Sequence, residues 1–441
     1  MSLLTYLKRK KFWIDDFFHG GKMWKHFKEV MFIINNPDQG EEIRKRKLSC
    51  MLEFACANTR FYSKINSNKL EDFPVINKQI VLDNYNDFVT PIEKIPGQIG
   101  DVHVQSTSGS TGTPFRVCQD TECRIRRIAT IKACNEQVGF HSYDLLMHFR
   151  AVKRHYEFND DIMWNREYNI IYVDNANLNN VKVERIIKTI NDNRVKFIRG
   201  YVTTMDTVTR YAVDHKIVFK HKPLFIAGGE LLTESLKDRI VNELGCSVIS
   251  QYANEENGIF GQSDVNGCPT TMILNRANCY IEILKLDSDE PVDNGELGRV
   301  VVTDFTNHAM PLIRYDIGDL AKVGSVTEGG IMLSIKSLSG RKTDMIIKTN
   351  GEYVDFFNSI SKDVAHSPTV KQWQFIQNGP KNYLLNLCLS DKMWESNKDH
   401  YIQLVKEVVG EDADVEVDFI EEIPVLNSGK RKLIINNWKK S

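Results

Sequence analysis

The residues with the clearest chemical meaning form a short run of hydroxyl side chains and glycines. Residues 106–114 read Ser-Thr-Ser-Gly-Ser-Thr-Gly-Thr-Pro. Glycines let consecutive backbone N–H groups turn toward one anion, and the hydroxyls add donors, so the run suits a phosphate. An ordinary flexible loop has a similar composition. No Gly-Lys-Ser/Thr follows the run, which excludes the phosphate loop of a Walker-type NTPase.

Five further groups of polar residues follow this run along the chain. They are Gly228-Gly229-Glu230, Tyr252-Ala253-Asn254-Glu255-Glu256, Tyr315-Asp316-Ile317-Gly318-Asp319, Gly340-Arg341-Lys342-Thr343-Asp344 and Ser428-Gly429-Lys430. Three of them have an ordinary explanation on their own: Asp319 as a turn aspartate, Arg341 as half of a surface ion pair, and Lys430 as part of a basic tail. Five or six ordered motifs are far less expected by chance than any single one.

In this order the groups resemble the motifs of the adenylate-forming ligase superfamily. Two stretches, Leu312-Ile313-Arg314-Tyr315 and residues 72–78, are similar in sequence to the phenylacetate-CoA ligase branch of this superfamily, particularly to members associated with capsular polysaccharide synthesis. The resemblance covers roughly residues 60–435. It implies an ATP-dependent ligase that converts a carboxylic acid to an acyl-adenylate and pyrophosphate, and then transfers the acyl group.

The resemblance also implies a role for each group. The expected nucleotide-binding residues are Ser106, Thr107, Ser108, Gly109, Ser110, Thr111, Gly112, Gly228, Gly229, Glu230, Tyr252, Ala253, Asp319 and Arg341. Asp319 would accept hydrogen bonds from the ribose diol, and Arg341 would supply a forked cation to the ribose or the α-phosphate. Glu256 would help to hold Mg²⁺ beside the triphosphate, as a single carboxylate among phosphate oxygens and waters.

Lys430, Glu256 and Arg341 are the expected catalytic residues. Adenylation brings a carboxylate against the α-phosphate of ATP, and a mobile lysine that bridges the two anions would stabilise the transition state. The acid pocket is expected at Tyr201, Ala227 and Gly228, because ligands collect at the carboxyl ends of parallel strands.

Two residues depart from the family pattern. Glu255 stands where a small hydroxyl residue normally contacts the α-phosphate, and its charge would be unfavourable there unless it points away. Thr343 replaces the common hinge aspartate, so either Thr343 or Asp344 is the pivot. These departures leave a second hypothesis, a catalytically degenerate nucleotide-binding subunit of a polysaccharide-assembly complex. The intact Lys430 and Asp319 argue against it.

The acyl acceptor stays open at this point. Coenzyme A is the default acceptor by resemblance, with a carrier-protein thiol or an amino group on a sugar as alternatives. The identity of the carboxylic acid is equally open. Cys268, Cys279 and His308 match no zinc spacing, and no GxSxG or HExxH motif supports a hydrolase.

The elements expected to position these residues make an α/β fold. From Val195 onward, β-branched runs at 195–198, 224–227 and 247–249 alternate with amphipathic stretches, which predicts βαβ units and a parallel sheet. One helix is expected to start after Thr233 and stop at Gly245. After about residue 279 the pattern predicts antiparallel or barrel-like strands at 280–284, 299–303 and 330–333.

The expected domains are a large N-terminal one and a small mobile C-terminal one. The first spans residues 1–340, with a parallel α/β part at about 60–278 and a β-rich part at about 279–338. The second, residues 341–441, would be an α+β lid carrying Lys430, with a helix around 398–409 and an acidic strand around 412–420.

The amino-acid composition indicates which kinds of partner and which compartment to expect. The 441 residues carry 57 Lys and Arg against 58 Asp and Glu, a net charge of −1, so nucleic acid is not an expected partner. Nine cysteines without a CxxC pair, and no signal or membrane-spanning segment, favour the cytoplasm. Residues 1–28 interleave seven Lys and Arg with aromatics, which is typical of a helix docked on its own domain or of peripheral contact with a membrane.

Overall fold

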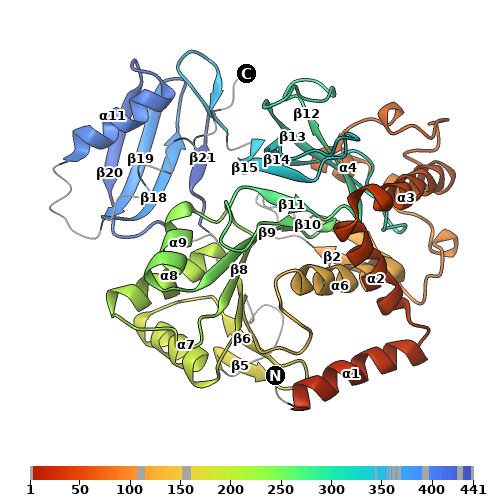
Figure 1. Cartoon of the computed structure of the whole chain (residues 1–441). Coiled ribbons are helices and arrows are strands. Elements are labelled where there is room, and N and C mark those ends of the chain that lie inside the picture. The colour runs from red at the N-terminus through yellow and green to blue at the C-terminus, as the bar shows by residue number, and fades with distance from the viewer. Residues whose placement is uncertain are drawn as a thin grey trace. The chain divides into compact units, whose positions relative to one another are not determined.

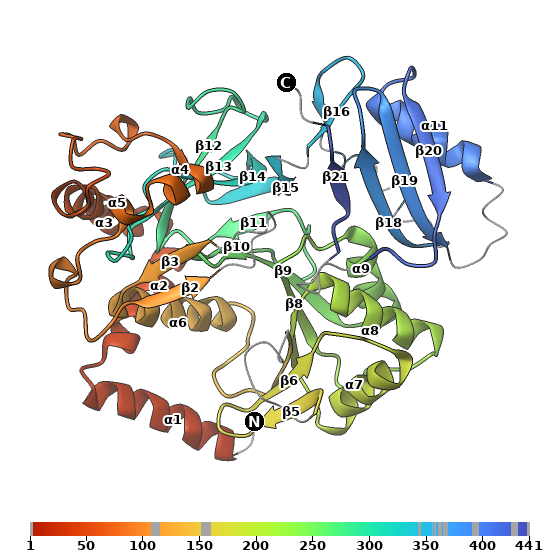
Figure 2. The same cartoon turned by 180° about the vertical axis from the view of Figure 1, so that it is seen from behind.

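The computed structural model describes residues 3–106, 115–150, 160–342, 345–354, 356, 359, 364, 369–389, 397–424 and 431–438. The chain forms two compact units (Figures 1 and 2). The first contains residues 1–144, 251–264 and 271–338, and the second contains residues 145–250, 265–270 and 339–441. The boundaries at 340 and 341 expected from the sequence stay a prediction.

The helices of the first unit come early in the chain. They are α1 (Leu3–Phe18), α2 (Lys22–Asn35), α3 (Pro37–Asn58), α4 (Lys78–Asp83), α5 (Tyr85–Phe88) and α6 (Thr121–Glu136), with 3-10 turns at Leu70–Asp72 and Ile92–Lys94. Local chemistry sets where several of them begin. Pro37 occupies the first turn of α3, where its missing N–H costs nothing. The Asp120 side chain caps α6 by accepting from the Cys123 N–H at 2.7 Å.

Antiparallel strands make the sheet of the first unit. The strands are β1 (Ile76–Asn77), β9 (Ser247–Asn254), β10 (Gly258–Gln262), β11 (Met272–Leu274), β12 (Cys279–Leu284), β13 (Leu297–Asp304), β14 (Tyr315–Val323) and β15 (Ser334–Arg341). Their order is β12-β13-β14-β15-β11-β10-β9, and β1 pairs parallel to β14. The first half of β9 and the end of β15 belong to the second unit. The antiparallel β12, β13 and β14 confirm the change of pattern after residue 279.

The prediction of a strand at residues 330–333 is wrong. This stretch makes one isolated bridge, between Val326 and Met332, and the regular strand starts at Ser334. Gly330 has a φ of +81° and its N–H bonds the Thr327 carbonyl at 3.0 Å, so the chain reverses here instead of extending.

Parallel strands make the first sheet of the second unit, as expected. The strands are β4 (Leu146–Arg150), β5 (Ile162–Asn165), β6 (Ile170–Asp174), β7 (Phe197–Gly200) and β8 (Leu224–Gly228). β4 pairs parallel to β6 and β7, β7 pairs parallel to β8, and β5 is an antiparallel edge. Helices α7 (Asn180–Asp192) and α8 (Val202–Asp214) pack together beside this sheet, as Figures 1 and 2 both show. Their apolar faces and those of the strands form one continuous core.

The helix expected after Thr233 is present but irregular. Thr233 caps α9 (Glu234–Asp238) by accepting from the Leu236 N–H at 3.2 Å. The helix then widens into a π-helical turn over Arg239–Glu243, and Gly245, with a φ of +61°, ends the segment.

The last part of the second unit holds a separate four-stranded sheet. Its order is β20 (Asp414–Phe419), β19 (Asn382–Leu389), β18 (Val370–Gln377), β21 (Ile434–Asn436), and α11 (Lys398–Val409) packs against it. The short strands β16 (Ile346–Ile347) and β17 (Tyr353–Val354) form a hairpin nearby in sequence. Helix α11 and strand β20 lie where the sequence predicts them.

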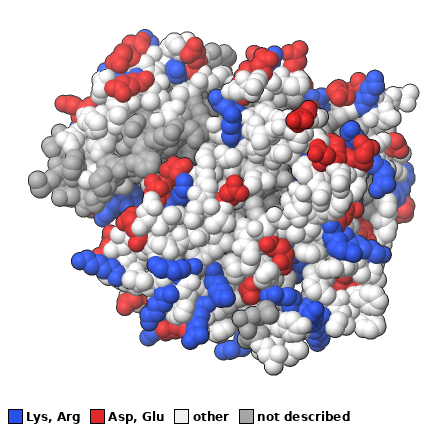
Figure 3. All heavy atoms as spheres, viewed as in Figure 1, with Lys and Arg blue, Asp and Glu red and all other residues white. Residues whose placement is uncertain are grey.

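Charges of both signs are interspersed over the face in Figure 3, as a net charge of −1 leads one to expect. All nine cysteines are free thiols. Within the ranges that the structure describes, no helix is both long enough and apolar enough to cross a membrane.

Candidate active site

A hydrogen bond joins two of the sequence motifs within the first unit. The Tyr252 hydroxyl on β9 donates to Asp319 Oδ2 on β14 at 2.8 Å, although the two residues are 67 positions apart. Tyr252 is buried. Burial, together with the nearby Asp319 carboxylate, raises the pKa of the Tyr252 hydroxyl well above its usual range, so the hydroxyl keeps its proton and stays a donor. The bond fixes one oxygen of the Asp319 carboxylate.

A bulge in β14 positions Asp319. Val301 pairs with Asp316 and Arg299 with Leu320, so three residues of β14 stand opposite one residue of β13. Gly318 has a φ of +85°, which glycine adopts without strain, and its N–H bonds the Asp316 side chain at 2.9 Å. A bulge of this kind re-aims a side chain out of the regular alternation.

Glu255 and Glu256 lie in the turn between β9 and β10. Asn254 pairs with Gly258 across this turn, and the Asn254 side chain accepts from the Asn257 N–H at 2.6 Å. Glu255 is exposed, which relieves the charge conflict that the sequence raises at this position. Ala253, on the strand just before it, is also exposed.

Arg127 on α6 holds this turn in place. Its guanidinium donates to the carbonyl of Glu255 at 2.8 Å and also to the carbonyl of Glu256. Gln119 adds a longer bond to the Glu255 carbonyl, at 3.4 Å. Sequence reasoning missed Arg127, because α6 carries several arginines and nothing in their spacing marks the one that bonds a turn more than 120 residues away.

The hydroxyl-rich run connects an antiparallel hairpin in the first unit. Strands β2 (His103–Ser106) and β3 (Arg116–Gln119) pair so that Ser106 stands opposite Arg116. Ser106 is exposed at the end of β2. Thr107, Ser108, Gly109, Ser110, Thr111 and Gly112 lie outside the described residues.

The residues expected to line the acid pocket meet at the carboxyl ends of β7 and β8 in the second unit. Gly200 pairs with Ala227, Gly228 ends β8, and Tyr201 precedes the first turn of α8. A Cβ atom on Gly200 would lie 2.5 Å from the Phe149 Cβ, so only glycine fits between β7 and β4. The parallel arrangement thus gathers Tyr201, Ala227 and Gly228 at one edge.

Glu230 connects this edge to the C-terminal part of the chain. Its carboxylate accepts from the Thr203 N–H at 2.9 Å and from the Thr203 hydroxyl at 2.7 Å, at the start of α8. It also accepts from the Arg431 N–H at 3.0 Å. A carboxylate is favourable at a helix N-terminus. Gly229 has a φ of +76° and turns the chain between β8 and Glu230.

Lys430 directly precedes Arg431, and it lies outside the described residues, as do Thr343 and Asp344. Arg431 is tied further by its side chain, which donates to the Ile423 carbonyl at 3.1 Å and to Glu422 at 2.6 Å. Arg341 is an exposed residue at the end of β15, in the second unit.

The two units therefore hold different shares of the predicted residues. The first brings together Tyr252 and Asp319, and also carries Ser106, Ala253 and Glu256. The second brings together Tyr201, Ala227, Gly228 and Glu230, and also carries Gly229 and Arg341.

The sequence raises two metal sites, zinc at Cys268, Cys279 and His308 and magnesium at Glu256. In the parts of the chain that the structure describes, no three His, Cys, Asp or Glu side chains gather to hold a metal, so Cys268, Cys279 and His308 form no zinc site there. Mg²⁺ held largely by phosphate oxygens needs only one or two protein carboxylates. Glu256 offers one.

Comparisons with known proteins show what this chain is similar to. A family described as the CapK C-terminal domain matches residues 346–437. Protein CapK of Staphylococcus aureus is 23% identical over 451 residues, covering 94% of this chain and 93% of that protein. The phenylacetate-coenzyme A ligase of Pseudomonas putida is 26% identical over 239 residues, covering 53% of this chain and 47% of that protein.

A crystal structure shares the fold over nearly the whole length. It is 2-hydroxyisobutyryl-CoA ligase in the postadenylation state, in complex with 2-HIB-AMP, with a TM-score of 0.69 at 15% identity over 91% of this chain and 90% of that one. In sequence the chain is similar to CapK over nearly its whole length and to phenylacetate-CoA ligases over part of it. These similarities support an enzyme of the acid-CoA ligase kind.

Proposed function

We propose that this chain is an ATP-dependent carboxylic-acid ligase. It forms an acyl-adenylate and pyrophosphate, and then transfers the acyl group to coenzyme A or to another thiol or amine. The observation that carries the proposal is the bond from Tyr252 to Asp319, because it joins two separate nucleotide-binding motifs of the superfamily.

In the proposed reaction, Asp319 receives the ribose hydroxyls of ATP. A carboxylate presents two acceptor oxygens, which suits the two hydroxyls of a diol. Arg127 holds the turn that presents Glu256, the proposed ligand of Mg²⁺. The metal would neutralise triphosphate charge, and Lys430 would stabilise the charge that develops where the carboxylate attacks the α-phosphorus.

The acyl acceptor is proposed to be coenzyme A, with a carrier-protein thiol or an amino sugar as alternatives. A role in surface polysaccharide synthesis is supported by the similarity to CapK and by the match of the C-terminal residues to its family. Rotation of residues 341–441 about Thr343 or Asp344 would exchange the adenylation step for the transfer step.

Acid-dependent release of pyrophosphate from Mg-ATP tests the proposal. The panel contains aryl, fatty, hydroxy and amino acids, and Lys430→Ala is compared with wild type. Lys432→Ala, two residues along the same basic segment, is the matched control. We expect release with a subset of acids, a loss of about a hundredfold or more in Lys430→Ala because a transition-state contact disappears, and little change in Lys432→Ala.

If no acid in the panel causes pyrophosphate release although ATP still binds, the proposal is contradicted. That result favours the degenerate nucleotide-binding subunit, for which copurification with polysaccharide enzymes is the next measurement. Release that needs no acid would contradict it too, because the carboxylic acid is a substrate of the proposed reaction.

The exposed apolar side of helix α1 supports a second proposal, that the protein works at a membrane surface. Helix α1 has no buried residue, and its exposed apolar side chains include Leu3, Leu7, Ile14, Phe17 and Phe18. At 100° per residue these five fall on one side of the helix, with Lys10 among them and Lys11 at the edge of that side.

The other side of α1 is docked on the first unit. The Trp13 ring contacts the Trp24 ring at 4.9 Å, Arg9 pairs with Asp144 at 3.3 Å, and the Asp16 carboxylate accepts from backbone N–H groups of α2. Because these contacts lie on that side, the side with the five exposed apolar residues is left outward, together with the exposed Lys10 and Lys11. We infer that α1 lies in the interface of an anionic membrane, with its lysines at the headgroups.

A further inference from the structure

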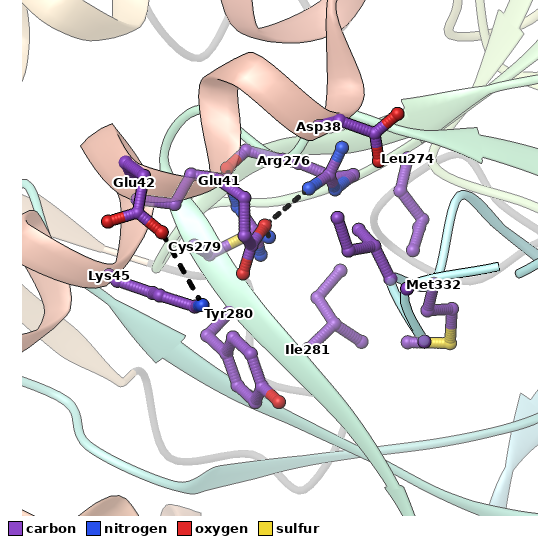
Figure 4. A pocket seen from close by; sticks show the side chains of 14 residues that line it. Asp38, Glu41, Glu42, Lys45, Leu274, Arg276, Cys279, Tyr280, Ile281 and Met332 are labelled. Atoms are coloured by element: carbon purple, nitrogen blue, oxygen red, sulfur yellow. Dashed lines mark hydrogen bonds and ion pairs between the residues drawn. The ribbon is translucent and has the colours of Figure 1, made fainter. Parts of the chain in front are cut away.

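The pocket shown in Figure 4, in the first unit, is electrically balanced. It has a volume of about 350 Å³, and the Arg276 and Arg44 guanidiniums on its wall share the Glu41 carboxylate. Its charged lining consists of equal numbers of acidic and basic side chains, which are Asp38, Glu41, Glu42, Arg44, Lys45 and Arg276. This pocket therefore selects neither charge in a ligand.

One face of helix α8, in the second unit, is a strip of polar side chains. Thr203, Asp206 and Arg210 stand at positions i, i+3 and i+7, so they lie one above another on this face. Met205 and Val208 lie on the opposite face and are buried in the core of the second unit. The polar strip is therefore turned away from that core.

This strip holds two points of the C-terminal four-stranded sheet. Arg210 Nη2 donates to the Lys371 carbonyl at 2.5 Å, and Thr203 Oγ1 accepts from the Arg431 N–H at 3.2 Å. Lys371 is the second residue of β18, and Arg431 precedes β21 by three residues. Because β18 and β21 are parallel neighbours, both contacts lie at the same edge of this sheet.

Asp206 orients the arginine that makes the first of these contacts. Its carboxylate accepts from Arg210 Nη2 at 3.2 Å and from Arg239 Nη1 at 2.6 Å. Burial opposes ionisation, but the two guanidiniums outweigh burial and hold the pKa of the Asp206 carboxyl below its usual range. The ionised carboxylate therefore holds Arg210 in place before it bonds Lys371, which reduces the side-chain entropy that this bond costs.

The edge that the strip holds is also tied together internally. The Arg431 guanidinium donates to the Ile423 carbonyl at 3.1 Å, and the Ile423 N–H donates to Gln372 Oε1 at 2.8 Å. These bonds join the segment before β21 to the start of β18. A displacement of β18 on α8 is therefore passed on to Arg431, the residue that follows Lys430.

We propose that Asp206 is a positioning residue for the adenylation step, an inference that rests on the proposed function. Through Arg210 it holds the edge of the C-terminal sheet on α8, and through that edge it sets where the chain beside Lys430 lies. The sheet has an apolar core of its own, and the strip contacts its edge through backbone atoms. Loss of Asp206 therefore loosens the edge without unfolding the sheet.

Hydrogen exchange and acid-dependent pyrophosphate release, both measured on the full-length protein, test this proposal. Asp206→Asn removes the charge at nearly the same size, Arg210→Met removes the donors, and Arg210→Lys keeps a cation. Arg185→Gln is the matched control, because Arg185 on the neighbouring α7 makes an exposed ion pair at 3.0 Å. Exchange is followed at the Arg431 amide, and pyrophosphate release gives kcat and the KM for ATP separately.

We expect the Arg431 amide to exchange about tenfold faster in Asp206→Asn and Arg210→Met, and kcat to fall about tenfold, while the KM for ATP changes less than about twofold. The KM is preserved because Tyr252 and Asp319, the proposed ribose contact, belong to the first unit. Arg210→Lys should recover most of both losses, and Arg185→Gln should match wild type.

Unchanged exchange in both variants would overturn the proposal, as would faster exchange with an unchanged kcat or a loss carried by the KM for ATP. If Asp206→Asn does not fold, Arg210→Met decides alone, because Arg210 is only half-buried. A wild-type protein that releases no pyrophosphate contradicts the proposed function, whereas the exchange measurement still shows whether Asp206 holds the edge.

Discussion

At the scale of single residues, the hydrogen bond from Tyr252 to Asp319 makes the sharpest prediction. Tyr252→Phe removes one hydroxyl and keeps the ring in its contact with Phe260. A hydrogen bond to a charged group contributes about 1.5–3 kcal/mol, so we expect kcat/KM for ATP to fall by roughly ten- to a hundredfold. Steady-state pyrophosphate release measures this, and thermal unfolding checks that the fold persists.

Tyr383→Phe is a suitable control for the loss of a buried tyrosine hydroxyl, because Tyr383 bonds the Ile347 carbonyl in the C-terminal sheet. It should cost stability without a specific effect on the KM for ATP. Equal effects of the two variants on that KM would sink the assignment of Asp319 to the ribose.

His148 on β4 makes a prediction about pH. Burial, with help from Arg199 and Arg150, lowers the pKa of His148 from 6.5 to about 3. The folded state therefore holds this imidazole neutral while the unfolded chain protonates it below pH 6.5. The resulting stability is fully present above pH 6.5 and is lost as the pH falls toward 3.

Between pH 6.5 and 4.5 we expect the wild type to lose up to about 2–3 kcal/mol of unfolding free energy because of His148. The variant His148→Gln should not show this loss. Urea unfolding at several pH values measures the difference between variant and wild type. The exposed His221→Gln serves as control, and its profile should follow that of wild type. Parallel profiles for His148→Gln and wild type would contradict the expectation.

At the scale of elements, Glu230 links the start of α8 to the segment that follows Lys430. Glu230→Ala removes acceptors from Thr203 and from the Arg431 N–H. We expect a loss of about 1–2 kcal/mol of stability, as for a lost helix cap, and a fall of about tenfold in pyrophosphate release.

Glu234→Ala is the matched carboxylate control, because Glu234 makes a surface ion pair with Lys237 one turn along α9. Such pairs contribute little, so this variant should resemble wild type. If Glu230→Ala loses stability but keeps full activity, the contact with Arg431 has no part in presenting Lys430.

At the scale of the whole molecule, we predict that the protein binds anionic membranes through helix α1. Sedimentation with phosphatidylglycerol vesicles should carry the wild-type protein down, and phosphatidylcholine vesicles should not. Reversing both charges in Lys10→Glu/Lys11→Glu should weaken binding at least about tenfold, since each lysine near an anionic surface contributes about 1 kcal/mol.

Lys188→Glu reverses the charge of an exposed residue on α7 and so controls for the change in net charge. Leu7→Asp separates the apolar contribution of α1 from its charge. Binding that survives both the double reversal and Leu7→Asp would remove α1 as the membrane contact.

Much of the architecture follows from sequence alone, because hydrophobic periodicity reports directly which face of an element is buried. The strands at β7 and β8, the cap at Thr233, helix α11 and the antiparallel pattern after residue 279 are all predictable. The strand expected at 330–333 fails because Gly329 and Gly330 permit a reversal that an apolar pattern does not register.

The sequence by itself determined the class of the protein and the types of residue it brings to chemistry, since motif order and periodicity are local properties that survive without coordinates. Tertiary structure alone decided which of them meet: Tyr252 with Asp319, Glu230 with the N–H of Arg431, and Arg127 with the turn that carries Glu256. It also decided that Arg276 is buried beside Arg44 with one shared carboxylate. Hydrogen bonds and desolvation depend on distances between residues far apart in the chain, and no local pattern encodes those distances.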